Sequence, residues 1–362
     1  MDFAAKVLNG KKQIDIRESN KSAVIDMMLQ QECNLAQLEE KLNLSHTALN
    51  KVIKELMEKK VVKLVGRRVQ EVGRPSAFYN INPDCGAAAA VSFTSNYLEI
   101  FIVDMRGFEI NRYCADYEYK DADTLLKLIV STLSQLSQHY RIKSQLLMLS
   151  ISVPASGLNE YTFEQWSQVF YDYFKDSQIV RGDIVVRRDI EFACIAERKF
   201  GVFKNGAENA VFLNLSGKMP MSIMFASESY YTASKSFNGN INALTHQDYR
   251  LLLQRHTGKH LSAASMEYTE NSPSAVAAVH SFFEPVVDKV ANLMFMLNID
   301  KLIVFGDIKL FGSNLLAYFQ DICRKKCSDA TVLISRITDR SLPCAGAIWH
   351  STYNSLKDII VR

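Results

Sequence analysis

The stretch NLAQLEEKLNLSHTALNKVIKELMEK, residues 34–59, decides the fold of the N-terminal part of the chain. Asn34 can cap a helix, and Gln37 follows three residues later, where its side chain can reach back to the cap. Three leucines at helical spacing then supply an apolar stripe: Leu35, Leu38 and Leu42. The stretch therefore begins with a short, capped amphipathic helix.

A tight turn follows this helix. Asn43 tolerates the left-handed backbone that such a turn requires, and Ser45 is well suited to cap a further helix that runs to Leu56. Upstream, apolar residues recur at helical spacing from Lys21 to Leu29 and predict a preceding helix. Three helices connected in this way predict a helix-turn-helix.

Two strand-forming segments come next, VVKLVGRR at 61–68 and SAFYNI at 76–81. Gly73-Arg74-Pro75 lies between them and predicts a slim tip that could enter a minor groove, so the pair forms a β-hairpin wing. Basic residues concentrate in this part of the chain: Lys51, Lys54, Lys59, Lys60, Lys63, Arg67, Arg68 and Arg74. Only three glutamates oppose them, which suits a surface that meets phosphates.

The helix after the turn is the candidate recognition helix, because the second helix of this motif lies in the major groove of DNA. The candidate DNA-binding residues are Ser45, His46, Thr47, Asn50, Lys51, Lys54, Arg67, Arg68 and Arg74. The alternative is that the small bundle and its hairpin form a protein-interaction module whose basic face is only solvated. The agreement of cap, turn and basic hairpin in one register favours DNA.

The composition is that of an ordinary globular protein: of 362 residues, 48% are hydrophobic and 22% charged, with a net charge of +3. No uninterrupted apolar run is long enough for a membrane helix and the start lacks a secretory signal, so we expect no membrane partner and a cytoplasmic location. The seven cysteines are scattered and read as reduced thiols. Cys323 and Cys327 could form half of a metal site, but no nearby cluster completes it, so we assign no metal.

Strands and helices alternate after the break at Pro83–Gly86, as in an α/β domain. Strand-like segments open two successive lobes, and we expect a cleft between them. The predicted division is a DNA-binding domain at 1–85, a first α/β lobe at 86–195, and a second α/β lobe with a C-terminal helix at 196–362.

The order of these features resembles the ROK family of repressors, open reading frames and kinases, and within it the xylose and N-acetylglucosamine repressor branch. The likeness rests on the N-terminal stretch and on YLEIFIVDMRG, SISVPASG, VVRRDIEFACIAERKFG and LIVFGDIKLFGSNLL. It implies an α/β protein in which a winged helix-turn-helix precedes a two-lobed, actin-like (ribonuclease-H-like) sugar-kinase fold. In that fold a sugar binds between the lobes, and kinase members place ATP beside it.

Several kinase motifs of that family are altered here. The catalytic base is the Asp of an Asn-Asp pair, and this chain has Arg188-Asp189 at the matching place. The glycine-rich phosphate loop is replaced by the segment 216–222, whose Pro220 removes a backbone amide. We therefore expect no phosphoryl transfer, no enzyme activity and no bound cofactor. Asp189 remains a vestigial catalytic candidate, or it forms an ion pair with Arg187 or Arg188.

The sugar and zinc motifs are also incomplete. In the sugar signature His246 is retained, but Ala243 stands where the family has a glutamate. The family's zinc cysteines are missing, and His256 and His260 read as surface or packing residues. The resemblance leaves these candidate ligand-binding residues: Arg188, Asp189, Asn240 and His246.

The sequence thus predicts a DNA-binding transcription regulator of carbohydrate-related genes. Its resemblance to repressors implies that it blocks transcription. The expected partners are a double-stranded DNA operator, a sugar or sugar-phosphate effector, and further copies of the chain in a homodimer or higher oligomer. Two alternatives stay open. One is an active sugar kinase with Asp189 as base, and the other is a scaffold that binds no ligand.

Overall fold

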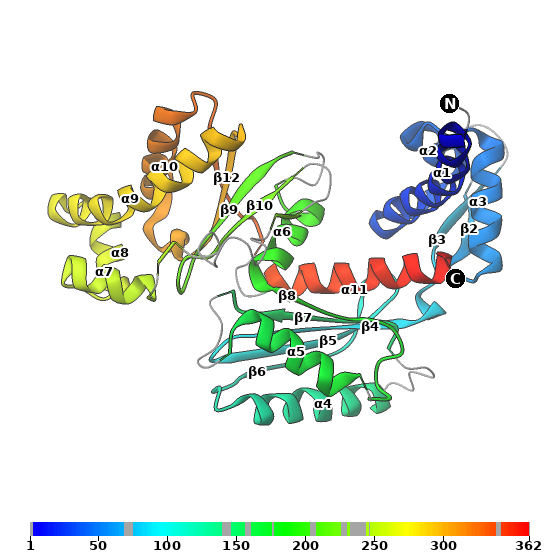
Figure 1. Cartoon of the computed structure of the whole chain (residues 1–362), viewed down its shortest axis with the longest axis horizontal. Coiled ribbons are helices and arrows are strands. Elements are labelled where there is room, and N and C mark those ends of the chain that lie inside the picture. The colour runs from blue at the N-terminus through cyan, green and yellow to red at the C-terminus, as the bar shows by residue number, and fades with distance from the viewer. Residues whose placement is uncertain are drawn as a thin grey trace.

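The structure is a computed structural model that describes residues 3–68, 75–139, 146–155, 161–175, 177–202, 208–225, 230–231, 244–245, 247–337 and 342–361. These residues form an N-terminal module and two larger parts, each built on a five-stranded sheet (Figure 1). Figure 1 also shows the C-terminal helix running over the first large sheet and ending beside the N-terminal module. The architecture is therefore of the mixed α/β class that the sequence predicts.

The N-terminal module combines three helices with a small antiparallel sheet. Its elements are α1 (Phe3–Gln30), β1 (Cys33–Asn34), α2 (Leu35–Leu42), α3 (His46–Glu58), β2 (Val62–Arg68) and β3 (Ser76–Ile81). The strand order is β1-β3-β2, and Arg68 pairs with Ser76 at the open end of the hairpin. The first helix begins at Phe3 rather than at Lys21, so the predicted start was wrong: the apolar spacing marks only the packed part of a longer helix.

The predicted caps and turn are confirmed. The Asn34 side chain accepts a hydrogen bond from the Gln37 amide at 2.9 Å, and the Gln37 side chain accepts one from the Asn34 amide at 3.0 Å. Asn43 has a left-handed backbone with φ 54°. Ser45 Oγ accepts from the Ala48 amide at 3.3 Å. These local bonds satisfy amides that the first turn of a helix otherwise leaves without partners.

The first large sheet has the strand order β6-β5-β4-β7-β8. Its strands are β4 (Ala87–Phe93), β5 (Tyr97–Asp104), β6 (Glu109–Asp116), β7 (Leu149–Val153) and β8 (Ile184–Arg188), and a short turn of 3-10 helix, η1 (Pro83–Cys85), precedes them. Helices α4 (Ala122–His139) and α5 (Phe163–Phe174) cover one face, where Trp166 packs against Phe93. The alternation of side chains along each strand leaves Ala88 and Ala90 on the other face.

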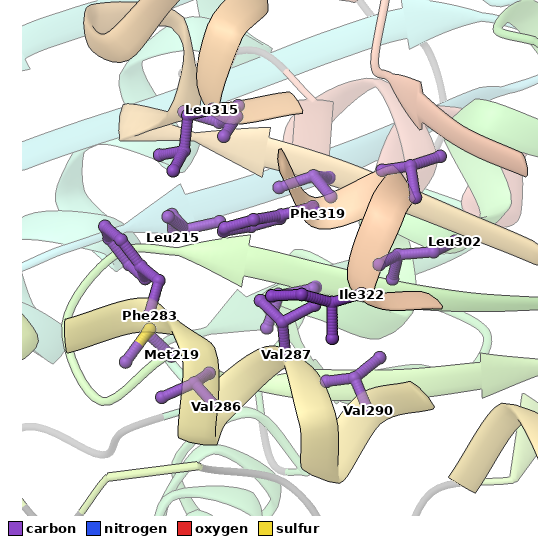
Figure 2. Packing of buried hydrophobic residues seen from close by; sticks show 14 of the residues in the cluster. Leu215, Met219, Phe283, Val286, Val287, Val290, Leu302, Leu315, Phe319 and Ile322 are labelled. Atoms are coloured by element: carbon purple, nitrogen blue, oxygen red, sulfur yellow. The ribbon is translucent and has the colours of Figure 1, made fainter. Parts of the chain in front are cut away.

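The second large sheet has the order β11-β10-β9-β12-β13. Its strands are β9 (Ala210–Leu215), β10 (Met221–Met224), β11 (Tyr230–Tyr231), β12 (Lys301–Gly306) and β13 (Thr331–Ile334). One face is covered by α7 (Tyr249–Thr257), α8 (Leu261–Thr269), α9 (Pro273–Leu297), η3 (Asp307–Phe311) and α10 (Gly312–Lys326). Figure 2 shows Phe283 and Val287 of α9 and Phe319 and Ile322 of α10 meeting over this sheet in a fully apolar core.

One helix, α6 (Asp189–Phe200), lies between the two large sheets. Its Ile190, Ala193 and Cys194 pack on the second sheet, in one core with Phe212 and Phe305. The boundary that the sequence places after residue 195 falls inside this helix. Because its residues are buried from Ile190 to Glu197, α6 belongs to the packing of both lobes.

The C-terminal helix α11 (Leu342–Val361) packs on α6, β4 and β7. The sequence groups this helix with the second lobe, but its contacts place it on the first sheet. Its last two turns also pack against the N-terminal module, where Leu356 and Ile360 share one core with Val24 and Leu56. The three parts of the chain are therefore joined by buried surface, not only by the chain itself.

Candidate nucleic-acid interface and interlobe cavity

The outer face of α3 carries the residues predicted to meet DNA. Ser45, His46, Thr47, Asn50, Lys51 and Lys54 are all exposed. The opposite face is buried in the module through Leu49, Val52, Ile53 and Leu56. A helix with one apolar face in a core and one polar face in solvent can lay the polar face in a groove without disturbing its packing.

The hairpin places two further candidates beside this face. Arg67 and Arg68 are exposed near the end of β2, whereas Arg74 lies outside the described residues. Arg68 forms an ion pair with Glu32 and lies over the ring of Phe78, 4.8 Å from its centroid. These contacts hold the guanidinium close to the body of the hairpin.

Two of the charges in the basic stretch serve the fold. Lys59 Nζ donates to the carbonyl oxygens of Ile359 at 3.2 Å and Ile360 at 2.5 Å, at the end of α11. Glu55 pairs with Lys21 at 3.0 Å. Lys59 is one of the basic residues that concentrate in this part of the sequence, but its ammonium group is bonded to α11 and does not join the basic residues on the outer face of α3.

A cavity of about 630 Å³ lies between the two large sheets. It is bounded by the turn between β4 and β5, the first residue of α6, the turn after β9, the start of α7 and the end of β12. The lining residues are Ser92–Tyr97, Asp116, Pro154, Asp189, Asn214, Ser216, Gly217, Asp248, Arg250, Phe305, Gly306, Asp307 and Pro343. A space of this size is ordinary for a small-molecule site.

Asp189 lines this cavity at the N-terminus of α6. Its Oδ1 accepts hydrogen bonds from the amides of Ala155 at 2.9 Å and Ile190 at 2.7 Å. Burial raises the pKa of this carboxyl group to about 6, against the lowering effect of those two amides. Such a raised pKa is frequent at functional sites, although structural carboxylates show it too.

The other candidate ligand residues are differently placed. Arg188 pairs with Glu164 at 3.2 Å and Glu191 at 3.3 Å, and lies 4.0 Å from the centroid of the Phe163 ring. Its guanidinium is thus used by glutamates, and it does not line the cavity. Asn240 and His246 lie outside the described residues.

The turn between β9 and β10 contains the segment 216–222, for which the sequence resemblance implies an altered phosphate loop. Gly217 and Met219 both have left-handed backbones, with φ 51° and 52°. The Met219 amide donates a hydrogen bond to the Ser216 carbonyl oxygen at 2.8 Å, and Pro220 has no amide hydrogen to donate. The Gly217 carbonyl accepts from the Tyr249 amide at 2.7 Å, which ties the turn to α7. These features reduce the number of amides available to a phosphate.

The charged lining of the cavity is mostly acidic. Asp116, Asp189, Asp248 and Asp307 contribute carboxylates, and Arg250 is the one cation among the described lining residues. Arg250 Nε bonds to Asp307 Oδ2 at 2.8 Å, and the Tyr249 hydroxyl donates to the same oxygen at 2.6 Å. The positive charge of Arg250 is therefore balanced by Asp307, and three carboxylates remain.

Sequence reasoning found Asp189 but missed Asp116, Asp248, Arg250 and Asp307. A signal for two of them is present. Asp307 directly follows the buried strand β12, and Asp248 directly precedes the helix α7, whose Arg250 amide its side chain caps at 2.9 Å. Polar residues at strand ends of an α/β sheet commonly face a ligand crevice.

The sequence also predicted that there is no metal site and no membrane-spanning helix, and the described residues can be searched for both. Within it, no group of three His, Cys, Asp or Glu side chains could hold a metal ion. His256 Nε2 lies 2.8 Å from Ser281 Oγ, and His260 forms the N-cap position of α8. No described helix is both long and apolar enough to cross a bilayer.

Replacing Asp189 by asparagine is expected to stabilise the protein at neutral pH. The pKa of the folded-state carboxyl is about 6, above its ordinary 3.8, so ionisation of Asp189 costs stability above pH 6 and nothing below pH 4. Asparagine keeps the acceptor for both amides, and we expect a gain of about 1–3 kcal/mol at pH 8 that vanishes near pH 4. Urea unfolding at the two pH values measures it, with the exposed Asp321→Asn as control. An equal gain at both would contradict the assigned pKa.

Comparison with solved structures identifies the fold. No family model and no curated protein sequence matches the chain. A crystal structure of a ROK family transcriptional regulator, a homologue of the E. coli MLC protein, matches with a TM-score of 0.72 and 16% identity, over 96% of this chain and 99% of that one.

Sugar kinases of the same family match a smaller part. The ROK hexokinase from Thermus thermophilus has a TM-score of 0.59 and 9% identity, over 72% of this chain and 97% of that one. The ROK family glucokinase from Streptomyces griseus, solved with glucose and AMPPNP, has a TM-score of 0.52 and 14% identity, over 72% and 98%. The chain thus has the fold of ROK regulators and kinases, and the resemblance found in the sequence is confirmed at the level of the fold.

Proposed function

We propose that this chain is a transcription regulator that binds a DNA operator through a winged helix-turn-helix at 1–85 and senses a ligand in the interlobe cavity. The observation that carries the proposal is the exposed polar face of α3, which presents Thr47, Asn50 and Lys51 together. Amide and ammonium groups on one helix face suit base edges and phosphates respectively.

The extent of the structural matches supports this choice over an enzyme. The regulator matches 96% of the chain, whereas each kinase leaves more than a quarter of it unmatched although nearly the whole kinase is covered. The unmatched share is close to that of the N-terminal 85 residues. The part of the chain that the kinases leave unmatched is thus similar in size to the proposed DNA-binding module.

The packing offers a route from the cavity to the module. Asp189 at the start of α6 lines the cavity, and Lys199 near its end bonds to Asp26 of α1 at 3.1 Å. Tyr353 of α11 donates to the other Asp26 oxygen at 3.2 Å. A ligand that shifts α6 would therefore act directly on the helix that supports α2 and α3.

The second candidate is a sugar kinase that carries a DNA-binding module. Asp189 favours it, because a cavity-lining carboxyl with a pKa near 6 suits a general base. The short supply of loop amides and the acidic lining oppose it, since both disfavour bound phosphates. ATP turnover with a panel of hexoses decides between them: transfer that Asp189→Asn abolishes would establish the kinase.

Selection of binding sites from random DNA, followed by gel shifts of the full chain, tests the proposed function. We expect a discrete operator, with two related half-sites if the chain acts as a dimer. Asn50→Ala should lower the affinity for the operator by about 5- to 100-fold. Lys51→Ala should lower the affinity for DNA of any sequence, and it should reduce the slope of log affinity against log salt concentration by about 1. Lys325→Ala, on the exposed side of α10, is the matched control. Selection that yields no discrete site would disprove the proposal.

A further inference from the structure

His46, the first residue of the proposed recognition helix α3, contacts the helix before it. Glu39 of α2 lies across the turn, and its Oε1 is 2.7 Å from His46 Nδ1. That oxygen is buried and receives no hydrogen bond from another described residue, whereas the side chain of His46 is 64% exposed. The contact therefore joins a shielded acceptor on α2 to a ring that stays open on the outer face of α3.

This contact decides which ring nitrogen carries a proton. A carboxylate oxygen has only lone pairs, so a ring nitrogen 2.7 Å away must be protonated for the two atoms to attract each other. In the neutral form of His46 the proton therefore lies on Nδ1, and Nε2 keeps a lone pair that can only accept. Glu39 is in this way a positioning residue, because it sets the hydrogen-bonding character of a ring that another molecule can meet.

An acceptor at the start of α3 suits only some of the groups that DNA displays. In the major groove adenine N6 and cytosine N4 donate, whereas guanine N7 and O6 and thymine O4 accept, as phosphate oxygens do. Resting on the proposed DNA-binding function, we propose that His46, set by Glu39, accepts a hydrogen bond from the exocyclic amine of one base in each operator half-site. Guanine and thymine are disfavoured at that position, because two acceptors would face each other.

Nitrogen NMR of the full chain with isotope-labelled histidine tests the position of the proton without DNA. At pH 8.5, where histidine side chains are neutral as a rule, we expect a protonated Nδ1 and a bare Nε2 for His46, whose signals are assigned by their loss in His46→Ala. Glu39→Gln should give a mixture of both tautomers, because a glutamine amide can accept from Nδ1 or donate to it. A proton mainly on Nε2 in the unaltered chain would overturn the inference.

Selection of DNA sites at the same pH compares the unaltered chain with His46→Ala. We expect one half-site position at which the unaltered chain selects adenine or cytosine and His46→Ala selects no base. Purine in place of adenine, or 2-pyrimidinone in place of cytosine, lacks the amine, and the matching analogue should lower the affinity of the unaltered chain alone by about two- to tenfold. Selection of guanine or thymine at that position, or equal base frequencies for both proteins, would contradict the proposed contact.

Glu40→Gln is the matched control for Glu39→Gln, because Glu40 is the next residue of α2 and is exposed. Both variants should raise the affinity for DNA of any sequence, since each removes a charge that repels phosphates. Only Glu39→Gln should also reduce the preference for the base with the amine, by about two- to fivefold; an equal change in both variants refutes the role of Glu39. A discrete operator without a position that depends on His46 refutes this inference alone, whereas selection of no discrete site refutes the regulator and this inference with it.

Discussion

Leu356→Ala is expected to lower the free energy of unfolding by about 2–5 kcal/mol and to reduce operator binding as well. Leu356 is fully buried in α11, yet its core is that of the N-terminal module, with Val24, Ile25 and Leu56. Removing its branched end leaves a cavity between α11 and the module that rigid helices cannot fill. The loss should therefore reach α3, although residue 356 is some three hundred positions away in sequence.

Denaturant unfolding, followed by the circular dichroism signal of the helices, measures the loss in the free energy of unfolding. Gel shifts with the selected operator measure the change in DNA affinity. Val361→Ala is the control, because that side chain lies near the same end of α11 but is 65% exposed. If Leu356→Ala cost no more than Val361→Ala, the shared core would not be a real source of stability.

Gly346→Ala should also be strongly destabilising, by about 1–3 kcal/mol or more. A Cβ at position 346 would lie 1.8 Å from the Phe192 carbonyl oxygen and 2.6 Å from its carbon. Both are backbone atoms of α6, so no side chain can rotate away and the two helices must separate. Because Phe192 lies one turn from Asp189, the separation should also disturb the cavity.

Gly66→Ala is the control, since nothing lies within 4 Å of a Cβ there. Unfolding midpoints of the two variants give the comparison. A Gly346→Ala variant as stable as Gly66→Ala would mean that α6 and α11 are not held in backbone contact.

The N-terminal module was predictable because its determinants are local. The side chains of Asn34, Gln37 and Ser45 accept hydrogen bonds from amides three residues away, and Asn43 forms the turn between two helices. The spacing of these residues is visible in the sequence. The start of α1 could not be predicted, because the residues before Lys21 have little apolar periodicity that would mark a helix. The sequence also could not show that Lys59 bonds to the end of α11, because its partners lie about 300 residues further along the chain.

The lobes follow the same rule. The sequence predicted two successive lobes in which strands and helices alternate, because alternation and apolar runs are local signals. The sequence could not predict that α11 packs on α6 and β4, because this packing depends on how distant segments fit together in space. The cavity was found through Asp189 alone, because Asp116, Asp248 and Asp307 come from separate elements and no spacing connects them.

The bond from Lys59 to the carbonyl of Ile360 has a consequence for biosynthesis. The N-terminal helices leave the ribosome first, but α11, whose Leu356 and Ile360 complete their core, is synthesised some three hundred residues later. A chain cut short before α11 would therefore carry α3 on an incomplete support. If the module binds DNA as we propose, such truncated products would compete poorly with the intact protein for its binding sites.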